Sequence, residues 1–542
     1  MAQLFPSDFD LTAIEHSEER AIKMLLTSLD DSWIIVPSVS ILVNKQDSEI
    51  DIVLVSYQTG VYLLEVKGGR ITVETGHWKS NGTTIKDPVA QIRNAQYSLI
   101  RRLKKQNIDL NGFFIQHLVV FPDIVDFPAN GAGPDCPRKI VLTQVELKDP
   151  IPAMSALSDE STVVPKDLLK RFLKALRPDV LEIEVDGSLV RGVSQRISKA
   201  TYDSLMPIIE LDENLRVNIR GAAGTGKTFL CKQWAKRSLK RNEATLLVCY
   251  NKILGSELAA RKDDMVKYVE NPPLFQVGSF HDVVVNLLGD LAPAVPDNAG
   301  QEFWDTGHAQ ALIANIQKIS VRFKTIIIDE GQDFHPLWLL ALEALLDDPA
   351  SGRILMASDQ KQAIYVESWV PPENWTTLEL KRNLRNTKAI SAAVQKLGGA
   401  PAREHAPIGP SIKFYTAGGR KEARKRIAEA IHFAMTTLDV PLSQIAVLVA
   451  HRDIRNWLCE NGAQIEDTDK FNLKVWQDRD EDSIVCETIQ GTKGIERQAI
   501  ILVNLDDEPE IDLTYIGASR AVAFLAIVGP PQFHAQFQSA KN

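Results

Sequence analysis

Residues 221–228, GAAGTGKT, have the types and the spacing that bind phosphate groups. The segment follows the apolar stretch LRVNIR and precedes FLCKQWAKRSL, so the pattern predicts a loop between a strand and a helix. Glycines let backbone N–H groups turn toward phosphate oxygens, a lysine neutralises phosphate charge, and a threonine hydroxyl binds Mg²⁺. We therefore expect a nucleotide site built by Gly221, Gly224, Thr225, Gly226, Lys227 and Thr228.

A second segment, FKTIIIDEGQDF, supplies the carboxylates that nucleotide hydrolysis requires. Its apolar run predicts a strand that ends at Asp329 and Glu330. At that end of a strand, Asp329 can hold Mg²⁺ and Glu330 can polarise the attacking water. The phosphate loop alone fits a kinase, a GTPase or a motor, and together the two segments predict Mg²⁺-dependent nucleotide hydrolysis.

A second candidate site lies in residues 49–69, EIDIVLVSYQTGVYLLEVKGG, which predict two strands joined at YQTG. If this turn is tight, Asp51 lies across from residues 66 to 68, and Glu65 and Lys67 share one face of their strand. The arrangement suits Mg²⁺ held by Asp51 and Glu65, with Lys67 assisting a water nucleophile or the developing phosphorane charge. The alternative is an edge strand that carries charge to prevent aggregation.

The segments that follow the phosphate loop resemble, in order and spacing, the motifs of superfamily 1 helicases of the UvrD/Rep type. They are SFHDVV, DEGQDF, SDQKQAIY, NLRN, TIQGTKGIE and YIGASRA, and with the loop they span roughly residues 195–542. The resemblance implies ATP as the nucleotide. It also implies that Arg385 and Arg520 stabilise charge on the leaving phosphates when two lobes close, an effect worth ~10³ to 10⁵ in rate. Further nucleotide contacts are implied for Gln332, for Gln362 near the γ-phosphate, and for Glu496 on the ribose.

The same resemblance implies contacts with a single nucleic-acid strand. Phe280 and His281 lie in the strand-contact motif, and Tyr365 and Trp369 offer ring faces on which bases could stack, although all four also fit packing roles. The adenine-reading glutamine of the family is not clear, and Thr201 falls nearest to it by spacing. The short spacings between motifs leave little room for insertions, so short-range translocation is expected rather than processive unwinding.

The D…E-x-K pattern of the hairpin resembles the PD-(D/E)XK nuclease core. With SEERAIKML before it and HWKSN and DPVAQIRNAQYSLIRRL after it, residues 10–125 are similar to the nuclease-related domain (NERD) family. The resemblance implies that Glu19, or alternatively Glu18, joins the metal site from the first helix. It also implies that Gln91 lies near the substrate, and that Mg²⁺ or Mn²⁺ is the metal.

The elements that must position these residues indicate an α/β protein. Helical spacing covers residues 13–29 and 88–106, and QHLVVFP and KIVLTQV read as strands. From about residue 200, short apolar runs alternate with helices, which argues for parallel sheets. We expect a PD-(D/E)XK-like α/β nuclease domain at 1–185, a linker at 186–200, and two RecA-like parallel α/β lobes at 201–378 and 379–542.

The totals of the chain agree with several domains. A chain of 542 residues exceeds what one hydrophobic core supports. The net charge of −9 excludes a wholly basic nucleic-acid coat but not a local basic groove. The five cysteines are scattered without a CxxC pair, and neither a secretory signal nor an apolar run of spanning length is visible. We expect a soluble, cytoplasmic protein.

These features predict an ATP-dependent nuclease–helicase, in which a superfamily 1 ATPase that moves on single-stranded DNA is coupled to a Mg²⁺-dependent NERD endonuclease. Resemblance to bacterial proteins with this pairing suggests DNA repair or defence against phage. The alternative is a nucleic-acid-activated ATPase switch whose NERD domain is not catalytic. Duplex DNA and RNA stay open as partners, as do polarity, an oligomer and a protein partner, and no membrane contact is expected.

Overall fold

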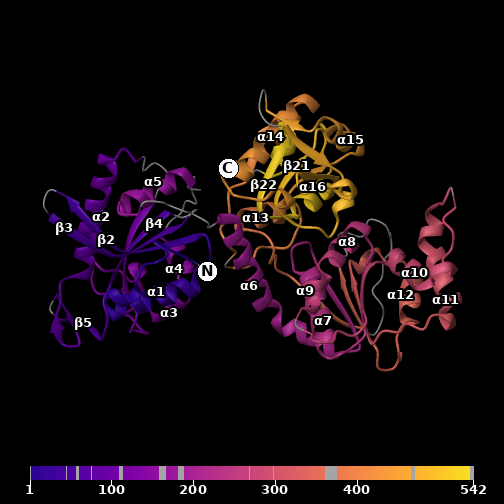
Figure 1. The fold of residues 1–542 in the computed structure, drawn as a ribbon, viewed down its shortest axis with the longest axis horizontal. Helices are drawn as coiled ribbons and strands as arrows, with labels where there is room; N and C mark the ends of the chain where they lie inside the picture. The colour runs from indigo at the N-terminus through magenta and orange to yellow at the C-terminus, as the bar shows by residue number, and fades with distance from the viewer. Residues whose placement is uncertain are drawn as a thin grey trace. The chain divides into compact units, whose positions relative to one another are not determined.

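The computed structural model describes residues 2–43, 46–56, 60–74, 76–108, 114–157, 166–180, 188–267, 269–296, 298–359, 375–404, 406–465 and 470–537. The chain forms two compact units, each described by itself (Figure 1). Unit 1 comprises Met1–Arg196, Pro407–Ser411 and His432–Val440, and unit 2 comprises Ile197–Ala406, Ile412–Ile431 and Pro441–Asn542. Helix α6 (Leu189–Ile209) occupies most of the expected linker at 186–200.

Unit 1 is built on a six-stranded mixed sheet with the order β1–β2–β3–β4–β8–β9. Strands β2, β3 and β4 pair in antiparallel fashion, and β1, β8 and β9 add in parallel. The expected hairpin is therefore confirmed as β3 and β4. The strand bounds are β1 Gln3–Leu4, β2 Trp33–Val43, β3 Gln46–Ser56, β4 Gly60–Val66, β8 Ile115–Phe121 and β9 Val141–Thr143.

Helices α1 (His16–Ser28) and α2 (Pro88–Lys105) confirm the two helices expected in this region. The Asp87 side chain accepts from the N–H groups of Val89 and Ala90 and so caps α2. A separate three-stranded sheet lies between β4 and α2 in sequence. The remaining elements are β5 Ile71–Glu74, β6 His77–Ser80, β7 Thr83–Thr84, α3 Gln144–Lys148, α4 Ile151–Ser155 and α5 Lys166–Leu176.

The first sheet of unit 2 has six strands in the order β12–β11–β13–β14–β10–β15, all parallel. Its central strands are buried on both faces: Ile327 packs into one core, and Ile326 and Ile328 pack into another. The expected boundary at 378/379 falls inside β15. The bounds are β10 Arg216–Gly221, β11 Thr245–Cys249, β12 Phe275–Ser279, β13 Thr325–Asp329, β14 Arg353–Ser358, β15 Thr376–Leu380, α7 Lys227–Lys240, α8 Lys252–Ala260, α9 Lys262–Val266, α10 Phe280–Leu288, α11 His308–Ala314 and α12 Pro336–Glu343.

The second sheet of unit 2 has seven strands in the order β16–β22–β21–β17–β20–β19–β18. All its pairs are parallel except β18–β19. The bounds are β16 Lys413–Thr416, β17 Ile445–Val449, β18 Ala463–Gln464, β19 Lys470–Lys474, β20 Ser483–Thr488, β21 Arg497–Val503, β22 Ala521–Gly529, α13 Lys388–Lys396, α14 Arg420–Thr436, α15 Arg452–Asn461, α16 Ile511–Ala518 and α17 Pro531–Ala535.

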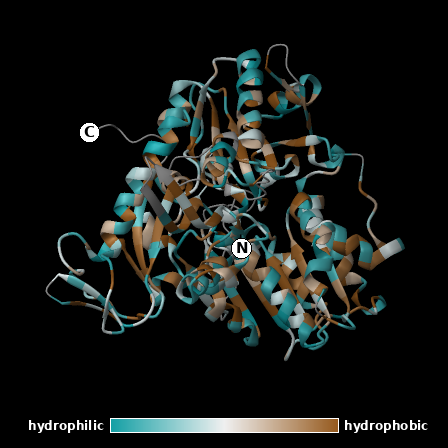
Figure 2. Ribbon diagram, turned by 60° about the vertical axis from the view of Figure 1, so that its left-hand side comes forward, coloured by the Kyte–Doolittle hydropathy of each residue, from teal (hydrophilic) through white to brown (hydrophobic). Residues whose placement is uncertain are grey.

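The fold is thus mixed α/β, as the sequence predicts, with a mixed sheet in unit 1 and, in unit 2, one parallel sheet and one that is parallel except for β18–β19. Hydrophobic residues concentrate on the sheet strands, and the outer faces of the helices are hydrophilic (Figure 2). Among the described residues, no helix has the length and apolar character needed to cross a membrane.

Candidate active sites

The phosphate loop lies at the carboxyl edge of the first sheet of unit 2. Strands β10, β13 and β14 end at Gly221, Asp329 and Ser358, and because the strands are parallel these ends meet at one edge. Helix α7 begins at Lys227, so the last two residues of the loop segment, Lys227 and Thr228, form the start of the helix. The strand–loop–helix order expected from the sequence is confirmed.

Two glycines of the loop adopt backbone conformations that side chains disfavour. Gly224 has φ of 82° and Gly226 has φ of 96°. A Cβ at Gly224 would lie 2.8 Å from the amide of Asn383, and a Cβ at Gly226 would lie 2.8 Å from Leu205. The loop therefore needs glycine at both positions for its shape and for its close packing.

Lys227 and Thr228 are both buried at the base of the loop. The Lys227 ammonium group donates to the carbonyl oxygens of Gly221 and Ala222 at 2.8 and 3.3 Å, and it lies 3.5 Å from a carboxylate oxygen of Asp359. The Thr228 side chain lies near Asp329, the carboxylate at the end of β13, and acts to lower its pKa. The threonine and the aspartate expected to share Mg²⁺ are thus neighbours.

Asp329 and Glu330 differ sharply in their surroundings. Burial and the adjacent Glu330 charge raise the pKa of Asp329 to about 6, and its Oδ2 atom is buried without a hydrogen-bond partner. Burial alone would raise the pKa of Glu330 as well, but the positive charges of Lys227, Lys493 and Arg520 lower it to about 2. The orphaned oxygen beside Thr228 fits a hard cation such as Mg²⁺.

Gln332 connects Glu330 to the strand next to β13. Its Nε2 donates to Glu330 Oε2 at 2.8 Å, and its Oε1 accepts from the Asp359 N–H at 2.7 Å. Gln332 is fully buried. The side chain is therefore held against Glu330, and its role as a nucleotide contact stays a prediction.

Arg385 and Arg520 approach this edge from segments that follow the first sheet. Arg520 is buried, and its pKa is lowered by burial and by the like charge of Arg385, so the two guanidinium groups are close. Arg385 forms an ion pair with Glu496, the residue expected on the ribose. The Thr201 hydroxyl donates to the Leu384 carbonyl oxygen at 3.2 Å. In this structure Arg385 uses its Nη2 atom to pair with Glu496, and its buried Nη1 atom has no hydrogen-bond partner among the described residues.

The aromatic residues expected to contact nucleic acid are only partly described. Phe280 has no exposed surface and stacks on Trp338 with ring centroids 4.3 Å apart, so the expectation of a strand contact is corrected: this ring is a packing residue. His281 is half-buried, and burial and the neighbouring His308 lower its pKa to about 4. Outside the described residues lie Gln362, Tyr365 and Trp369.

In unit 1, the hairpin brings together the three residues of the D…E-x-K pattern. Strand pairing aligns Ile52 with Leu64 and Ser56 with Gly60, so Asp51 lies level with Glu65 rather than with residues 66 to 68. The expected register was wrong because Gly60 pairs with Ser56, and this pairing places Glu65 opposite Asp51. The Asp51 carboxylate accepts from the Val66 N–H at 2.7 Å, and Lys67 Nζ lies 2.7 Å from Glu65 Oε1.

The three groups strongly influence one another. Burial, then the charge of Asp51, raise the pKa of Glu65 to about 7, and burial also raises the pKa of Asp51. Burial favours the neutral amine of Lys67, but the charges of Glu65 and Asp51 outweigh this and raise its pKa. Two carboxylates and an ammonium group thus share one small, partly buried volume.

A cleft of 610 Å³ opens beside Lys67. It is also lined by Glu15, His16, Ser80, Lys86 and Gln91. The Oε1 atom of Gln91 is buried and has no hydrogen-bond partner. Gln91 therefore presents an unsatisfied acceptor near the D…E-x-K group.

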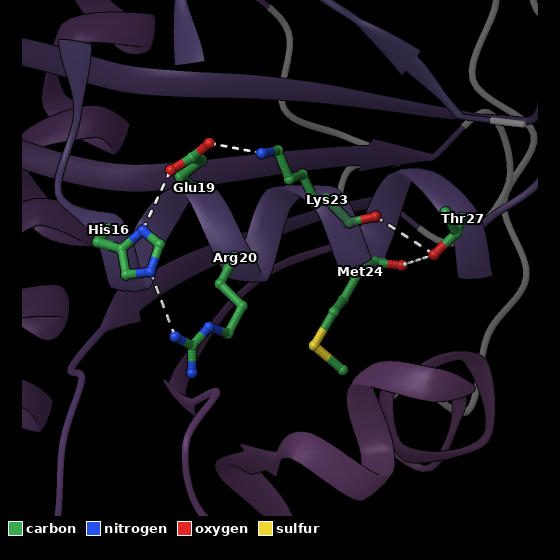
Figure 3. Close-up of a pocket in the computed structure, with 6 residues that line it drawn as sticks. All are labelled: His16, Glu19, Arg20, Lys23, Met24 and Thr27. Carbon is green, nitrogen blue, oxygen red and sulfur yellow. Dashed lines mark hydrogen bonds and ion pairs between the residues drawn. The ribbon is translucent and has the colours of Figure 1, made fainter. Parts of the chain in front are cut away.

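Glu19 lies elsewhere, which corrects the expectation that it joins the metal site. It lines a different hollow, of 360 Å³, where it bonds Lys23 at 2.5 Å and His16 at 3.2 Å (Figure 3). Glu18 is the carboxylate that interacts electrostatically with the D…E-x-K group: burial, then the charge of Asp51, raise the pKa of Glu18 to about 7. The reason is helical periodicity: Glu18 precedes the buried Leu25 by seven residues, about two full turns, and so lies on its face, whereas Glu19 is turned about 100° away from that position.

The hairpin partly fits a divalent metal. Asp51 and Glu65 offer hard oxygen donors, and each uses one oxygen in a hydrogen bond described above. Among the described residues, however, no three His, Cys, Asp or Glu side chains are grouped so as to hold a metal ion. The protein ligands for a metal here would be Asp51 and Glu65.

Four residues important to the geometry were not singled out by the sequence analysis. Lys493 and Asp333 form a buried ion pair at 2.6 Å, and Asn383 and Asn386 hydrogen-bond at 2.6 Å. All four lie inside motif segments that the analysis quoted. The sequence analysis named only the motif members that the resemblance links to nucleotide or to a strand, so the residues that bond to one another inside the protein were missed.

Comparison with known proteins adds a family for part of the chain. No curated protein matches the chain. Among solved structures, it is similar to the Arterivirus nonstructural protein 10 helicase (14% identity, TM-score 0.31, 61% of this chain and 64% of that chain). It is also similar to that helicase in complex with DNA (13%, 0.30, 61% and 65%) and to the PRRSV helicase (12%, 0.31, 62% and 57%). The chain spans less than two thirds of the length of each of these helicases. The family whose model matches is the nuclease-related domain, over residues 15–122, which contain the D…E-x-K group.

Proposed function

We propose that unit 2 is a nucleic-acid-stimulated ATPase of the superfamily 1 helicase type that grips single-stranded DNA. One observation carries the proposal: Glu330, buried at the end of β13 and held by Gln332, lies where the positive charges of Lys227 of the phosphate loop, Lys493 and Arg520 lower its pKa. These three residues lie in three separate motif segments, and their charges converge on one carboxylate. An ionised buried carboxylate next to a phosphate loop suits a residue that orients and polarises water.

In this proposal the residues act as follows. The N–H groups of the loop and Lys227 bind the β- and γ-phosphates, and Lys227 exchanges its bonds to Gly221 and Ala222 for bonds to phosphate. Thr228 and Asp329 hold Mg²⁺, which neutralises phosphate charge. Glu330, steadied by Gln332, orients the attacking water. Arg385 and Arg520 stabilise the charge that develops on the phosphates, and Arg385 leaves Glu496 to do so.

We propose that residues 15–122 form a metal-dependent nuclease domain. The family match and the gathering of Asp51, Glu65 and Lys67 support this. Asp51 and Glu65 would hold Mg²⁺ or Mn²⁺, which supplies Lewis acidity toward a phosphodiester. Lys67, kept protonated by the carboxylates, stabilises negative charge on the phosphorus oxygens, and Gln91, which lines the cleft and has an unpaired carbonyl oxygen, would contact the substrate.

Together these activities make an ATP-dependent nuclease that acts on DNA, and we propose DNA repair or defence against phage as its setting. The choice of DNA as the substrate is based on the resemblance of the sequence motifs to those of superfamily 1 DNA helicases. RNA is the competing substrate in the same test.

The ATPase is tested by measuring phosphate release with and without single-stranded DNA, duplex DNA and RNA, in Mg²⁺. The wild-type protein is expected to hydrolyse ATP faster when a strand is present. Lys227→Ala should lose this activity, because no other side chain of the loop can neutralise the β- and γ-phosphates. Equal turnover by wild type and Lys227→Ala would reject the assignment.

The nuclease is tested by cleavage of the same nucleic acids in Mg²⁺ or Mn²⁺, with Lys67→Ala as the variant and Lys86→Ala as a matched cleft lysine outside the D…E-x-K group. Cleavage should require a metal and Lys67. Undiminished cleavage by Lys67→Ala would remove this site from consideration.

A second candidate function is a nucleic-acid-activated ATPase switch whose NERD domain binds without cutting. It is favoured by the lack, among the described residues, of three metal-ligating side chains in one group. Strand-stimulated ATP hydrolysis without cleavage of any tested nucleic acid would select this alternative.

A further inference from the structure

The turn Asn383–Asn386, which carries Arg385, is fixed to the phosphate loop through backbone groups. The N–H groups of Leu384 and Arg385 both donate to the carbonyl oxygen of Gly224, at 2.7 and 3.0 Å. The left-handed conformation of Gly224 brings that part of the loop against Asn383. The position of Arg385 is therefore tied to the position of the loop.

Within the turn, the side chain of Asn383 holds the backbone of the residues that follow. It is fully buried, and its Oδ1 atom accepts from the N–H groups of Arg385 and Asn386 at 3.1 and 3.2 Å. Two backbone donors can be satisfied only by the carbonyl oxygen of an amide, so its orientation is determined. The Nδ2 atom must then be the group that donates to Asn386 Oδ1 at 2.6 Å.

This orientation passes on to Asn386, which is also buried. Because its Oδ1 accepts from Asn383, its Nδ2 atom is the donor, and it donates to the carbonyl oxygens of Ser519, at 3.3 Å, and Ala521. These two residues flank Arg520. One amide thus holds the backbone on both sides of the second arginine.

We propose that Asn383 and Asn386 are positioning residues that place Arg385 and Arg520 together against the phosphate loop. The inference rests on the proposed ATPase and deepens it. Both side chains are buried, and the carbonyl oxygen and the amide nitrogen of each are already engaged in the bonds above. The pair therefore acts through the arginines and not on the phosphates.

A positioning role predicts that the transition state depends on the two amides more than the ground-state complex does. A displacement of about 1 Å of a group that stabilises the transition state costs about 10²-fold in rate. The ground-state complex with ADP depends on the loop and Lys227 and should be much less sensitive. Loss of either amide should therefore lower the affinity for a transition-state mimic far more than the affinity for ADP.

The test uses the full-length protein with Asn386→Leu, Asn386→Asp and the matched control Asn504→Leu. Asn504 is another buried asparagine of unit 2, whose Oδ1 accepts from the Asp506 N–H at 2.9 Å, and within the described part of the chain it forms no hydrogen bond with Asn383–Asn386 or with Ser519–Ala521. Asn386→Asp keeps the size of the side chain and the acceptor for Asn383 but removes the amide donor. It therefore serves if the leucine variant does not fold.

The measurements are calorimetric Kd values for ADP–Mg²⁺ with and without aluminium fluoride, and kcat and KM for ATP. Both Asn386 variants should lose about 10²-fold in kcat and in affinity for the aluminium fluoride complex, with the Kd for ADP changed by less than about threefold. Asn504→Leu should change neither kcat nor the ratio of the Kd for ADP to the Kd for its aluminium fluoride complex. Equal losses of ADP and aluminium fluoride affinity, or unchanged kcat, would overturn the inference. Absence of ATP hydrolysis by the wild type would instead remove the proposed function, and the inference with it.

Discussion

The Nζ atom of Lys493 lies 2.6 and 2.9 Å from the two carboxylate oxygens of Asp333. Both side chains are almost fully buried. Asp333 follows β13 of the first sheet of unit 2, and Lys493 precedes β21 of the second. This ion pair therefore joins the segment that carries Glu330 to the segment that carries Glu496. Burial raises the pKa of Asp333 to about 7, although the charge of Lys493 opposes that shift.

Replacing Lys493 by methionine should destabilise unit 2 strongly. The Asp333 carboxylate would stay buried without its cation, and breaking a buried pair from one side costs about 3 to 5 kcal/mol. Calorimetric unfolding of the wild type and Lys493→Met gives the difference. The double variant Asp333→Leu/Lys493→Met is the control, because it leaves no buried charge and should recover most of the lost stability.

The penalty of Lys493→Met should also depend on pH. A carboxyl whose pKa is raised in the folded state loses stability as pH rises from its unfolded pKa, near 4, through its folded pKa. Without Lys493 the pKa of Asp333 should exceed the value of about 7 that it has in the wild type. The variant should therefore be closest to the wild type near pH 5 and weakest at pH 8. A loss of unfolding free energy in Lys493→Met that grows as the pH falls would contradict this assignment of the charges.

Gly224→Ala should weaken nucleotide binding through the shape of the phosphate loop. The residue has φ of 82°, and the added Cβ would lie 2.8 Å from the buried Asn383 amide, which is held by hydrogen bonds. A strained left-handed residue costs about 1 to 3 kcal/mol, so the Kd for ATP should rise by about tenfold or more. Gly398→Ala is the matched control, because Gly398 has φ of 93° and open space for a Cβ. If both variants bind ATP as the wild type does, the loop does not require this conformation.

The sequence predicted the elements of the fold where hydrophobic period and motif agree. The phosphate loop follows β10 and starts α7 because its glycines, its lysine and the flanking apolar runs specify both sides. The register of the hairpin was missed, since it depends on how far pairing continues toward the turn, and Ser56 pairs with Gly60. Local composition at YQTG does not determine that.

Within the candidate sites, the sequence identified residues by chemistry and missed those that act by geometry. Asn383 and Asn386 carry no charge, and their partners at Gly224, Ser519 and Ala521 are distant in sequence. Such partners follow from tertiary packing and cannot be read from spacing. The face of Glu18 was predictable, in contrast, because it precedes Leu25, an apolar residue of the same helix, by about two full turns.

Phe280 tests whether a motif aromatic binds a strand or packs the core. Its ring stacks on Trp338 at 4.3 Å and has no exposed surface. Phe280→Ala should cost about 3 to 5 kcal/mol of stability, the usual loss for a large core residue. Phe280→Leu, the milder variant, should fold and bind single-stranded DNA with unchanged affinity. A stacking residue would instead lose about 1 to 3 kcal/mol of binding per base, so weakened binding at full stability would reject the packing role.

Glu18 and Glu19 are neighbours in sequence but face different surroundings, and this separates two versions of the nuclease site. The Glu18 carboxyl senses the Asp51 charge, whereas Glu19 bonds Lys23 and His16 on another face of α1. Glu18→Gln should therefore reduce metal-dependent cleavage by about tenfold or more, the loss typical of groups that support a metal site. The affinity for Mn²⁺ should change in parallel.

Glu19→Gln is the matched control, since it makes the same chemical change one residue away. It removes a carboxylate whose pKa is lowered by hydrogen bonds from Lys23 and His16, so it should cost little stability and leave cleavage unchanged. Equal cleavage rates in wild type and Glu18→Gln, with a loss in Glu19→Gln, would restore the original assignment. In that case α1 would have to turn about its axis when metal binds, because one helix face cannot present both carboxylates to Asp51.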